Sequence, residues 1–192
     1  MQHRQIGPLN VSAIGLGCMN LSHAYGAPVS PEQGERVLLA ALDAGVTLFD
    51  TAALYGFGNN EELLGRVLKP HRRTITLASK GGMAGVQFAD GLKRVIDGRP
   101  EALRRNCEDS LRRLQTDVID LYYLHRWDKS VPIEDSVGAM ADLVQAGKVL
   151  AATAVRQGGV GHALARMTFG NRLGVSLTAA PAADFLIPAY GS

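Results

Sequence analysis

Short apolar runs alternate with amphipathic stretches along most of the chain, from residue 12 to about residue 155. The apolar runs predict strands at residues 12–17, 46–50, 74–79, 118–125 and 149–155. Between them, apolar residues recur at helical spacing in four stretches that begin near residues 30, 59, 100 and 133. Strands that alternate with helices favour βαβ units around a parallel sheet, so the sequence predicts the α/β class.

Local signals mark the ends of several predicted helices. Ser30 before Pro31 predicts a helix start, because serine is a preferred N-cap and proline fits the first helical position. Gly45 is expected to end that helix. Either Asn59 or Asn60 is expected to cap the next helix, because asparagine is also a preferred N-cap.

Two further segments lie outside this alternation. Residues 4–11 predict a small N-terminal β-hairpin that turns at Gly7-Pro8. Residues 83–98 predict a long loop, and a loop longer than a connector requires is often functional.

The composition changes near residue 150. Residues 150–192 hold four charged side chains, against thirty-four in residues 1–149. The regular alternation of strands and helices also stops there. We therefore expect one α/β domain over residues 1–149, which the resemblance described below implies is a partial barrel. We expect a divergent tail over residues 150–192, which is either the product of a frameshift or gene truncation or a poorly ordered segment.

Bulk composition excludes several classes of partner. The formal net charge is +2 and no block of like charges occurs, which disfavours nucleic acid and anionic membranes as partners. No apolar run approaches the ~20 residues of a membrane helix, and no signal peptide is recognisable. Cys18 and Cys107 show neither metal-ligand spacing nor a disulfide framework. The sequence therefore predicts a reduced, cytoplasmic protein without a metal site.

Chemistry-bearing residues stand at the ends of the predicted strands, where loops converge in parallel α/β folds. These residues are Asp50, Tyr55, Lys80 and His125. Each also has a structural interpretation: the aspartate could cap a turn, the lysine could be solvated, and the two rings could pack in the core. Their succession at neighbouring strand ends favours a shared site.

The runs that contain these residues resemble the aldo-keto reductases. Residues 45–56 read Gly-Val-Thr-Leu-Phe-Asp-Thr-Ala-Ala-Leu-Tyr-Gly and residues 60–65 read Asn-Glu-Glu-Leu-Leu-Gly. Residues 77–81, Leu-Ala-Ser-Lys-Gly, and 120–125, Asp-Leu-Tyr-Tyr-Leu-His, match two later blocks of that family in order and spacing. Residues 14–19, Ile-Gly-Leu-Gly-Cys-Met, fit its opening. The resemblance extends over about residues 3–149.

The resemblance implies a (β/α)8 TIM-barrel type of fold, here incomplete with about four to five βα units. It also implies NADPH-dependent reduction of an aldehyde or ketone to an alcohol. Tyr55 would donate the proton, although a free tyrosine ionises only near pH ~10. Lys80 would favour the ionised phenol, Asp50 would hold the lysine, and His125 would bind the carbonyl oxygen.

The resemblance also implies binding residues. Residues expected to contact the NADPH cofactor are Gly17, Cys18, Met19 and Asp50. Residues expected to line the pocket of a small carbonyl substrate are Tyr25, Tyr55, His125 and Trp127.

Two other interpretations remain open. The chain could be a catalytically inactive barrel fragment, or a non-catalytic regulatory or binding module of the same fold. An incomplete barrel has open sheet edges, which predict self-association.

Overall fold

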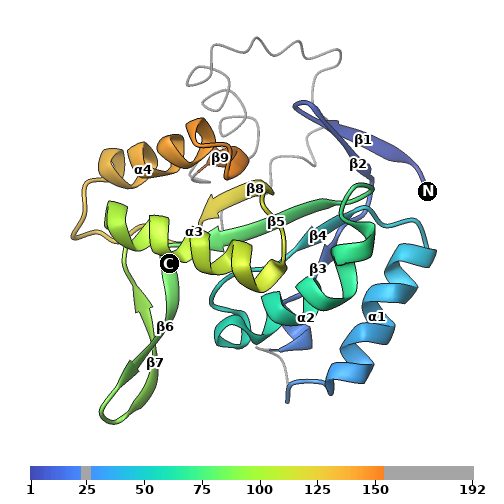
Figure 1. Ribbon diagram of the computed structural model, residues 1–192, viewed down its shortest axis with the longest axis horizontal. Helices are drawn as coiled ribbons and strands as arrows, with labels where there is room; N and C mark the ends of the chain where they lie inside the picture. The colour runs from blue at the N-terminus through green and yellow to red at the C-terminus, as the bar shows by residue number, and fades with distance from the viewer. Residues whose placement is uncertain (23–26, 154–192) are drawn as a thin grey trace.

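The computed structural model describes residues 1–22 and 27–153, and its centre is a five-stranded parallel sheet (Figure 1). The spatial order of the strands is their order along the chain. They are β3 (Leu16–Gly17), β4 (Leu48–Asp50), β5 (Thr76–Gly81), β8 (Ile119–Leu124) and β9 (Val149–Thr153). The predicted alternation of strands and helices is therefore confirmed, although the predicted strand over residues 74–79 begins and ends two residues later.

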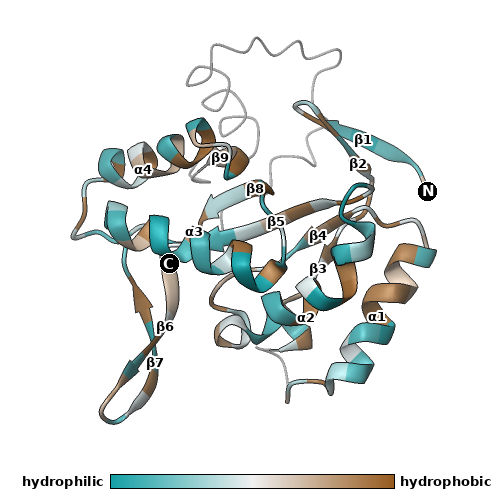
Figure 2. Cartoon of the chain, in the orientation of Figure 1, coloured by the Kyte–Doolittle hydropathy of each residue, from teal (hydrophilic) through white to brown (hydrophobic). Residues whose placement is uncertain are grey.

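Four α-helices in the described ranges connect these strands: α1 (Pro31–Asp43), α2 (Asn59–Leu68), α3 (Pro100–Leu114) and α4 (Ile133–Gln145). Neighbouring helices along the chain contact one another, α1 with α2, α2 with α3 and α3 with α4. Their apolar sides bury one hydrophobic core against the sheet, as the brown helix faces in Figure 2 show. Each helix contributes buried side chains to this core, for example Leu38 of α1, Leu64 of α2, Leu103 of α3 and Met140 of α4.

The helix boundaries follow the sequence in two cases and depart from it in a third. The Ser30 hydroxyl accepts a hydrogen bond from the Gln33 N–H, so the predicted cap of α1 is confirmed. Gly45, with φ +82°, follows the helix in the left-handed conformation that glycine favours. The predicted asparagine cap of α2 is wrong. Gly58 is the N-cap residue, and the Asn60 side chain bonds to other loops instead.

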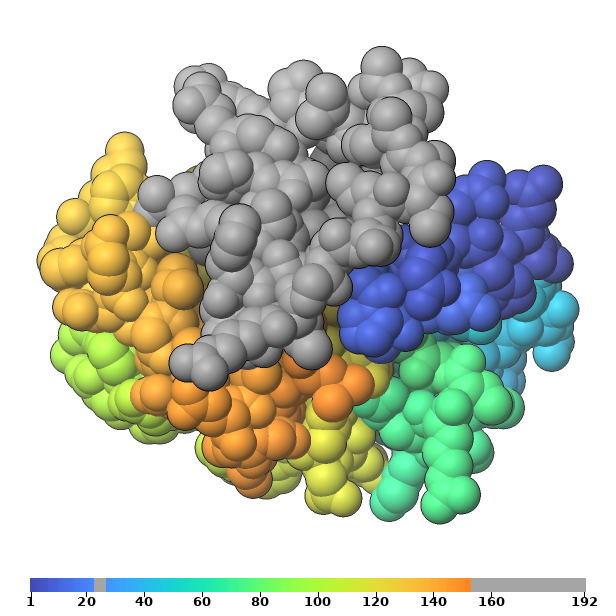
Figure 3. All heavy atoms as spheres, turned by 90° about the horizontal axis from the view of Figure 1, so that it is seen from above, coloured from blue at the N-terminus to red at the C-terminus, as the bar shows by residue number. Residues whose placement is uncertain are grey.

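The predicted N-terminal hairpin is confirmed as β1 (His3–Ile6) paired with β2 (Leu9–Ser12). Ser12 and Thr47 exchange backbone-to-side-chain hydrogen bonds of 2.8 and 2.9 Å, which fasten the hairpin beside the start of β4. In the view of Figure 3 the hairpin lies at the right of the molecule and α4 at the left. The expected strand over residues 12–17 is thus divided between β2 and the short β3.

The predicted loop over residues 83–98 is wrong. These residues form a second antiparallel hairpin, β6 (Met83–Phe88) and β7 (Gly91–Ile96), which projects from the body of the molecule (Figure 1). The two strands meet at a two-residue turn, Ala89-Asp90, before Gly91 at φ +120°. An Asp-Gly pair between two alternating stretches is a hairpin signal, and it was the overlooked feature of this segment.

The expected boundary at residue 149 falls inside β9, and residues 154–192 lie outside the described part of the chain, so the division into barrel and tail stays a prediction. Within residues 1–22 and 27–153, no helix is long and apolar enough to cross a membrane.

Candidate active site

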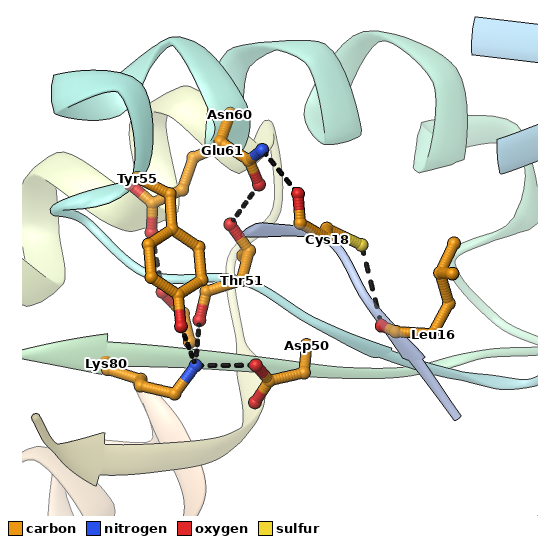
Figure 4. Close-up of polar contacts among 9 residues, drawn as sticks. Leu16, Cys18, Asp50, Thr51, Tyr55, Asn60, Glu61 and Lys80 are labelled. Atoms are coloured by element: carbon orange, nitrogen blue, oxygen red, sulfur yellow. Dashed lines mark hydrogen bonds and ion pairs between the residues drawn. The ribbon is translucent and has the colours of Figure 1, made fainter. Parts of the chain in front are cut away.

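The ammonium group of Lys80 is the centre of a polar cluster at the carboxyl ends of the strands (Figure 4). Its Nζ donates to Asp50 Oδ1 at 2.5 Å, to the Thr51 carbonyl at 2.8 Å and to the Tyr55 hydroxyl at 3.0 Å. A lysine ammonium has three N–H donors, so these contacts use all of them. The cation also lies 4.8 Å from the centre of the Tyr55 ring. The cluster therefore fixes one positive charge against one phenol oxygen.

The parallel pairing of β4 with β5 explains why these groups meet. Asp50 ends β4 and pairs in register with Ala78 of β5, which places Lys80 two residues further along the neighbouring strand. Tyr55 begins the short 3-10 helix η2 (Tyr55–Gly58) that follows β4. Phe57, with φ +53°, stands between two glycines that also have positive φ. This sharp turn directs the chain into α2 directly after the tyrosine, and such strained backbone is frequent at functional sites.

His125 completes the cluster from β8. Its backbone N–H donates to the Gly81 carbonyl at 2.9 Å, and its ring lies perpendicular to that of Tyr55 with centroids 5.8 Å apart. Burial, and then the nearby charges of Lys80 and Arg126, lower the pKa of His125 to about 4. The imidazole is therefore neutral near pH 7. Its buried Nδ1 has no hydrogen-bond partner among the described residues.

The end of β3 forms the other flank of the cluster. The backbone N–H of Cys18 donates to the Asp50 carbonyl at 2.8 Å, and Met19 packs beside Tyr55. Burial, and then the charge of Asp50, raise the pKa of the Cys18 thiol to about 12, so this thiol is protonated and not a nucleophile near pH 7. Gly17 is exposed, and open space surrounds the position that a Cβ would take.

The family model described as the aldo/keto reductase family matches residues 13–155. The chain belongs to the aldo/keto reductase family. A curated relative named Probable aldo-keto reductase 1, from Glycine max, is 46% identical over 140 residues, or 72% of this chain and 40% of that protein. The resemblance seen in the sequence is thereby confirmed.

Solved aldo/keto reductases share the fold. The holo form of AKR11C1 from Bacillus halodurans is 35% identical with a TM-score of 0.68 over 82% of this chain and 51% of that one. Glycerol dehydrogenase AKR11B4 from Gluconobacter oxydans is 33% identical with a TM-score of 0.70, over 83% and 50% of the two chains. An enzyme from Klebsiella pneumoniae, solved with NADP and acetate, is 33% identical with a TM-score of 0.64, over 86% and 53%.

These comparisons confirm a barrel-type α/β fold, which the described residues contain in part. The chain spans about half the length of these solved reductases and 40% of the curated relative.

The remaining predicted site residues are Tyr25 and Trp127. Tyr25 lies outside the described residues. Trp127 is 46% exposed, and its Nε1–H donates to the Val131 carbonyl at 2.9 Å. The structure thus brings Asp50, Tyr55 and Lys80 into contact with His125 beside them, and it leaves Trp127 on the loop after β8.

Several buried polar residues around the cluster were missed by the sequence reasoning. Thr51, Asn60, Glu61 and Ser79 are all completely buried, and each has a hydrogen-bonding partner. Glu61 accepts from Ser79 at 2.6 Å and from Arg113 of α3 at 2.6 and 2.7 Å. Since Asn60, Glu61 and Ser79 lie within the quoted family runs, the signal was a polar residue at a position where the helix or strand pattern expects an apolar one.

A cavity of about 230 Å³ lies between the β6–β7 hairpin, η2 and α3. Phe57, Arg105 and Asn106 are among its lining residues, whereas the catalytic candidates are not. The described ranges contain no group of three or more histidine, cysteine, aspartate or glutamate side chains that could hold a metal ion.

Proposed function

We propose that this chain carries the acid–base site of an NADPH-dependent reductase that converts a small aldehyde or ketone into the alcohol. The observation that supports this most strongly is the threefold contact of the Lys80 ammonium with Asp50, Thr51 and Tyr55. The comparisons support oxidoreductase chemistry for the family, and one relative was solved with NADP.

Tyr55 is the proton donor in this proposal. When its proton leaves for the alkoxide oxygen, a phenolate remains, and the Lys80 N–H at 3.0 Å stabilises that negative charge. Asp50 orients the lysine, because the carboxylate accepts one of its N–H bonds.

His125 positions the carbonyl group. Its ring lies against Tyr55 and is neutral near pH 7, so it offers one N–H donor and one acceptor without adding charge. A substrate oxygen that accepts from this imidazole also lies within reach of the tyrosine hydroxyl. Trp127 and Tyr25 are proposed to line the same substrate pocket from their loops.

The residues that would hold the nicotinamide end of NADPH are Gly17, Cys18, Met19 and Asp50. They suit the role because Gly17 is exposed with open space around it, and because the Cys18 N–H ties this turn to Asp50. When bound, the cofactor supplies a hydride to the carbonyl carbon.

Fluorescence titration of the purified chain with NADPH tests the proposal, followed by an aromatic aldehyde in the same cuvette. Saturable binding at micromolar cofactor and consumption of NADPH after the aldehyde is added are the expected results. No binding up to millimolar NADPH would show that the chain is an inactive fragment. Binding without turnover would favour a regulatory or binding module.

Self-association is proposed through the edge strands β3 and β9 of the five-stranded sheet. Sedimentation velocity over a tenfold range of concentration would show a rising average mass if this is correct. A constant monomer mass would contradict it.

A further inference from the structure

Asn60, in the first turn of α2, bonds to two segments that follow strands of the site. The side chain is completely buried. Its Nδ2 donates to the Cys18 carbonyl at 2.9 Å, and its Oδ1 accepts from the Thr51 hydroxyl at 2.7 Å (Figure 4). The Nδ2 also donates to the Ser22 hydroxyl at 2.9 Å. The amide therefore joins the segment after β3 to the segment after β4.

The orientation of this amide follows from its partners. The Cys18 carbonyl can only accept a hydrogen bond, so the amide nitrogen must face it. The amide oxygen then faces Thr51, whose hydroxyl must donate. The Cys18 carbonyl therefore specifies the orientation of Asn60, and the Thr51 and Ser22 hydroxyls, which can donate or accept, fit that orientation.

Thr51 transmits this constraint to the lysine. Its side chain bonds to Asn60, and its backbone carbonyl accepts from the Lys80 ammonium at 2.8 Å. Since Thr51 is itself completely buried, its carbonyl direction is set by the few bonds that hold the residue. The Thr51 N–H donates to the Ala78 carbonyl at 2.9 Å, which leaves the hydroxyl–amide bond as the restraint on the α2 side.

We infer that Asn60 is a positioning residue for the proton donor. Through Thr51 it holds the third acceptor of the Lys80 ammonium, and through Cys18 it holds the turn proposed for the cofactor. It contacts none of the reacting groups itself. This inference rests on the proposed function, because the lysine matters to catalysis only if Tyr55 donates the proton.

The neighbouring Glu61 shows why the inference is specific to Asn60. Glu61 bonds to Ser79 and to Arg113, a residue of α3 on the helix side of the sheet. None of its hydrogen bonds reaches Lys80 or its acceptors. Loss of Glu61 is therefore expected to lower stability, whereas loss of the Asn60 amide is expected to loosen the ammonium group.

The test compares Asn60→Ala and Thr51→Val with the wild-type chain, and uses Asn59→Ala as the matched control. Asn59 is the same residue type one position earlier and is exposed. Thr51→Val removes only the hydroxyl, at nearly constant volume, so it stays informative if Asn60→Ala does not fold. Thr51→Ser restores a hydroxyl and is the rescue variant.

Exchange of the Lys80 ammonium protons with water is the first measurement, by NMR on 15N-lysine-labelled protein, with Lys80→Met to assign the signal. We expect exchange roughly tenfold faster in Asn60→Ala and Thr51→Val, and near the wild-type rate in Asn59→Ala and Thr51→Ser. Steady-state rates are the second measurement. A loss of roughly tenfold or more in kcat is expected for the two disruptive variants, with KM for the aldehyde changed less than kcat.

The two measurements separate the two claims. If the wild-type chain does not turn over, the proposed function fails, and ammonium exchange still decides whether Asn60 holds the lysine. Unchanged exchange in folded Asn60→Ala and Thr51→Val would overturn the inference, even if both variants melt at a lower temperature.

Discussion

Tyr55 and Tyr122 are both buried, yet their hydroxyl groups have opposite environments. The Tyr55 hydroxyl lies at the strand ends and accepts from the Lys80 ammonium at 3.0 Å. The Tyr122 hydroxyl lies in the core between sheet and helices and has no partner in the described part of the chain. Burial raises the pKa of Tyr122 well above its usual value. The hydroxyl of one tyrosine thus contacts a cation, whereas the hydroxyl of the other is enclosed in the core.

The difference extends to the surroundings of the two tyrosines. Tyr122 belongs to a buried apolar cluster that includes Leu103, Cys107 and Leu124, and the charges of Glu61 and Arg113 also act on its hydroxyl. Beside Lys80 the completely buried Thr51 and Asn60 are bonded to each other, and the completely buried Ser79 and Glu61 form a second bonded pair. Burying a polar group costs free energy unless it is paired. A buried hydrogen-bonded network of this kind indicates a place where the positions of the side chains are fixed more closely than apolar packing alone would fix them.

The largest effect is expected where a charge of this network loses its partner. Arg113→Ala leaves the completely buried Glu61 carboxylate unpaired, so the free energy of unfolding should fall by about 3–5 kcal/mol. Lys93→Ala is the control, because its pair with Asp90 is exposed on both sides and should change stability by less than ~1 kcal/mol. Urea denaturation at pH 7 measures both. Equal, small losses would show that Glu61 is solvated or protonated.

A second prediction concerns the packing of α2 on α3. A Cβ on Gly65 would lie 2.2 Å from the Arg113 carbonyl oxygen, a backbone atom that cannot move aside without shifting α3. We expect Gly65→Ala to lower the free energy of unfolding by roughly 1–3 kcal/mol. Gly138→Ala, in α4 with no atom within 4 Å of the new methyl, should stabilise by up to ~1 kcal/mol. Thermal melts of the pair should therefore shift in opposite directions. A shift in the same direction would refute the close approach.

A third prediction uses the pH dependence of stability. His125 has a pKa of about 4 in the folded chain, below the usual 6.5. The unfolded chain therefore binds the extra proton first, and stability falls as the pH is lowered through this window. We expect the loss between pH 7 and pH 4.5 to be about 1–2 kcal/mol smaller in His125→Gln. Urea midpoints of both proteins at the two pH values test this. Parallel losses would mean that the imidazole is exposed to water.

The smallest effect is expected at Tyr122. Removing a buried hydroxyl that has no partner should cost nothing or stabilise slightly. Tyr122→Phe is predicted to change the free energy of unfolding by less than ~0.5 kcal/mol in the destabilising direction. A larger loss in urea denaturation would reveal a hydrogen bond to this hydroxyl.

The sequence was informative where one residue type dictates local geometry. Ser30 and Gly45 bounded α1 correctly, because caps and left-handed ends have strong preferences. The sequence also indicated correctly that Asp50, Lys80 and His125 lie close together. They follow one another at the ends of neighbouring parallel strands, and parallel pairing places those ends at the same edge of the sheet. Their catalytic roles stay predictions.

The failures arose where distant contacts decide the structure. Asn60 fits a helix cap in isolation, but Cys18 and Thr51, far along the chain, provide its real partners. A glutamate in the first turn of a helix is usually exposed. Glu61 can be buried because Arg113 of α3 bonds to its carboxylate. The β6–β7 hairpin was a different failure, because its turn signal was local and was overlooked.

The most direct test of the central claim is the rate of NADPH oxidation with an aromatic aldehyde, measured for wild type, Tyr55→Phe and Tyr122→Phe. Each variant differs from the wild type by a single hydroxyl. The proton-donor role predicts that Tyr55→Phe lowers kcat by roughly 10²–10⁴, whereas Tyr122→Phe stays near the wild-type rate. Turnover by Tyr55→Phe at the wild-type rate would contradict it.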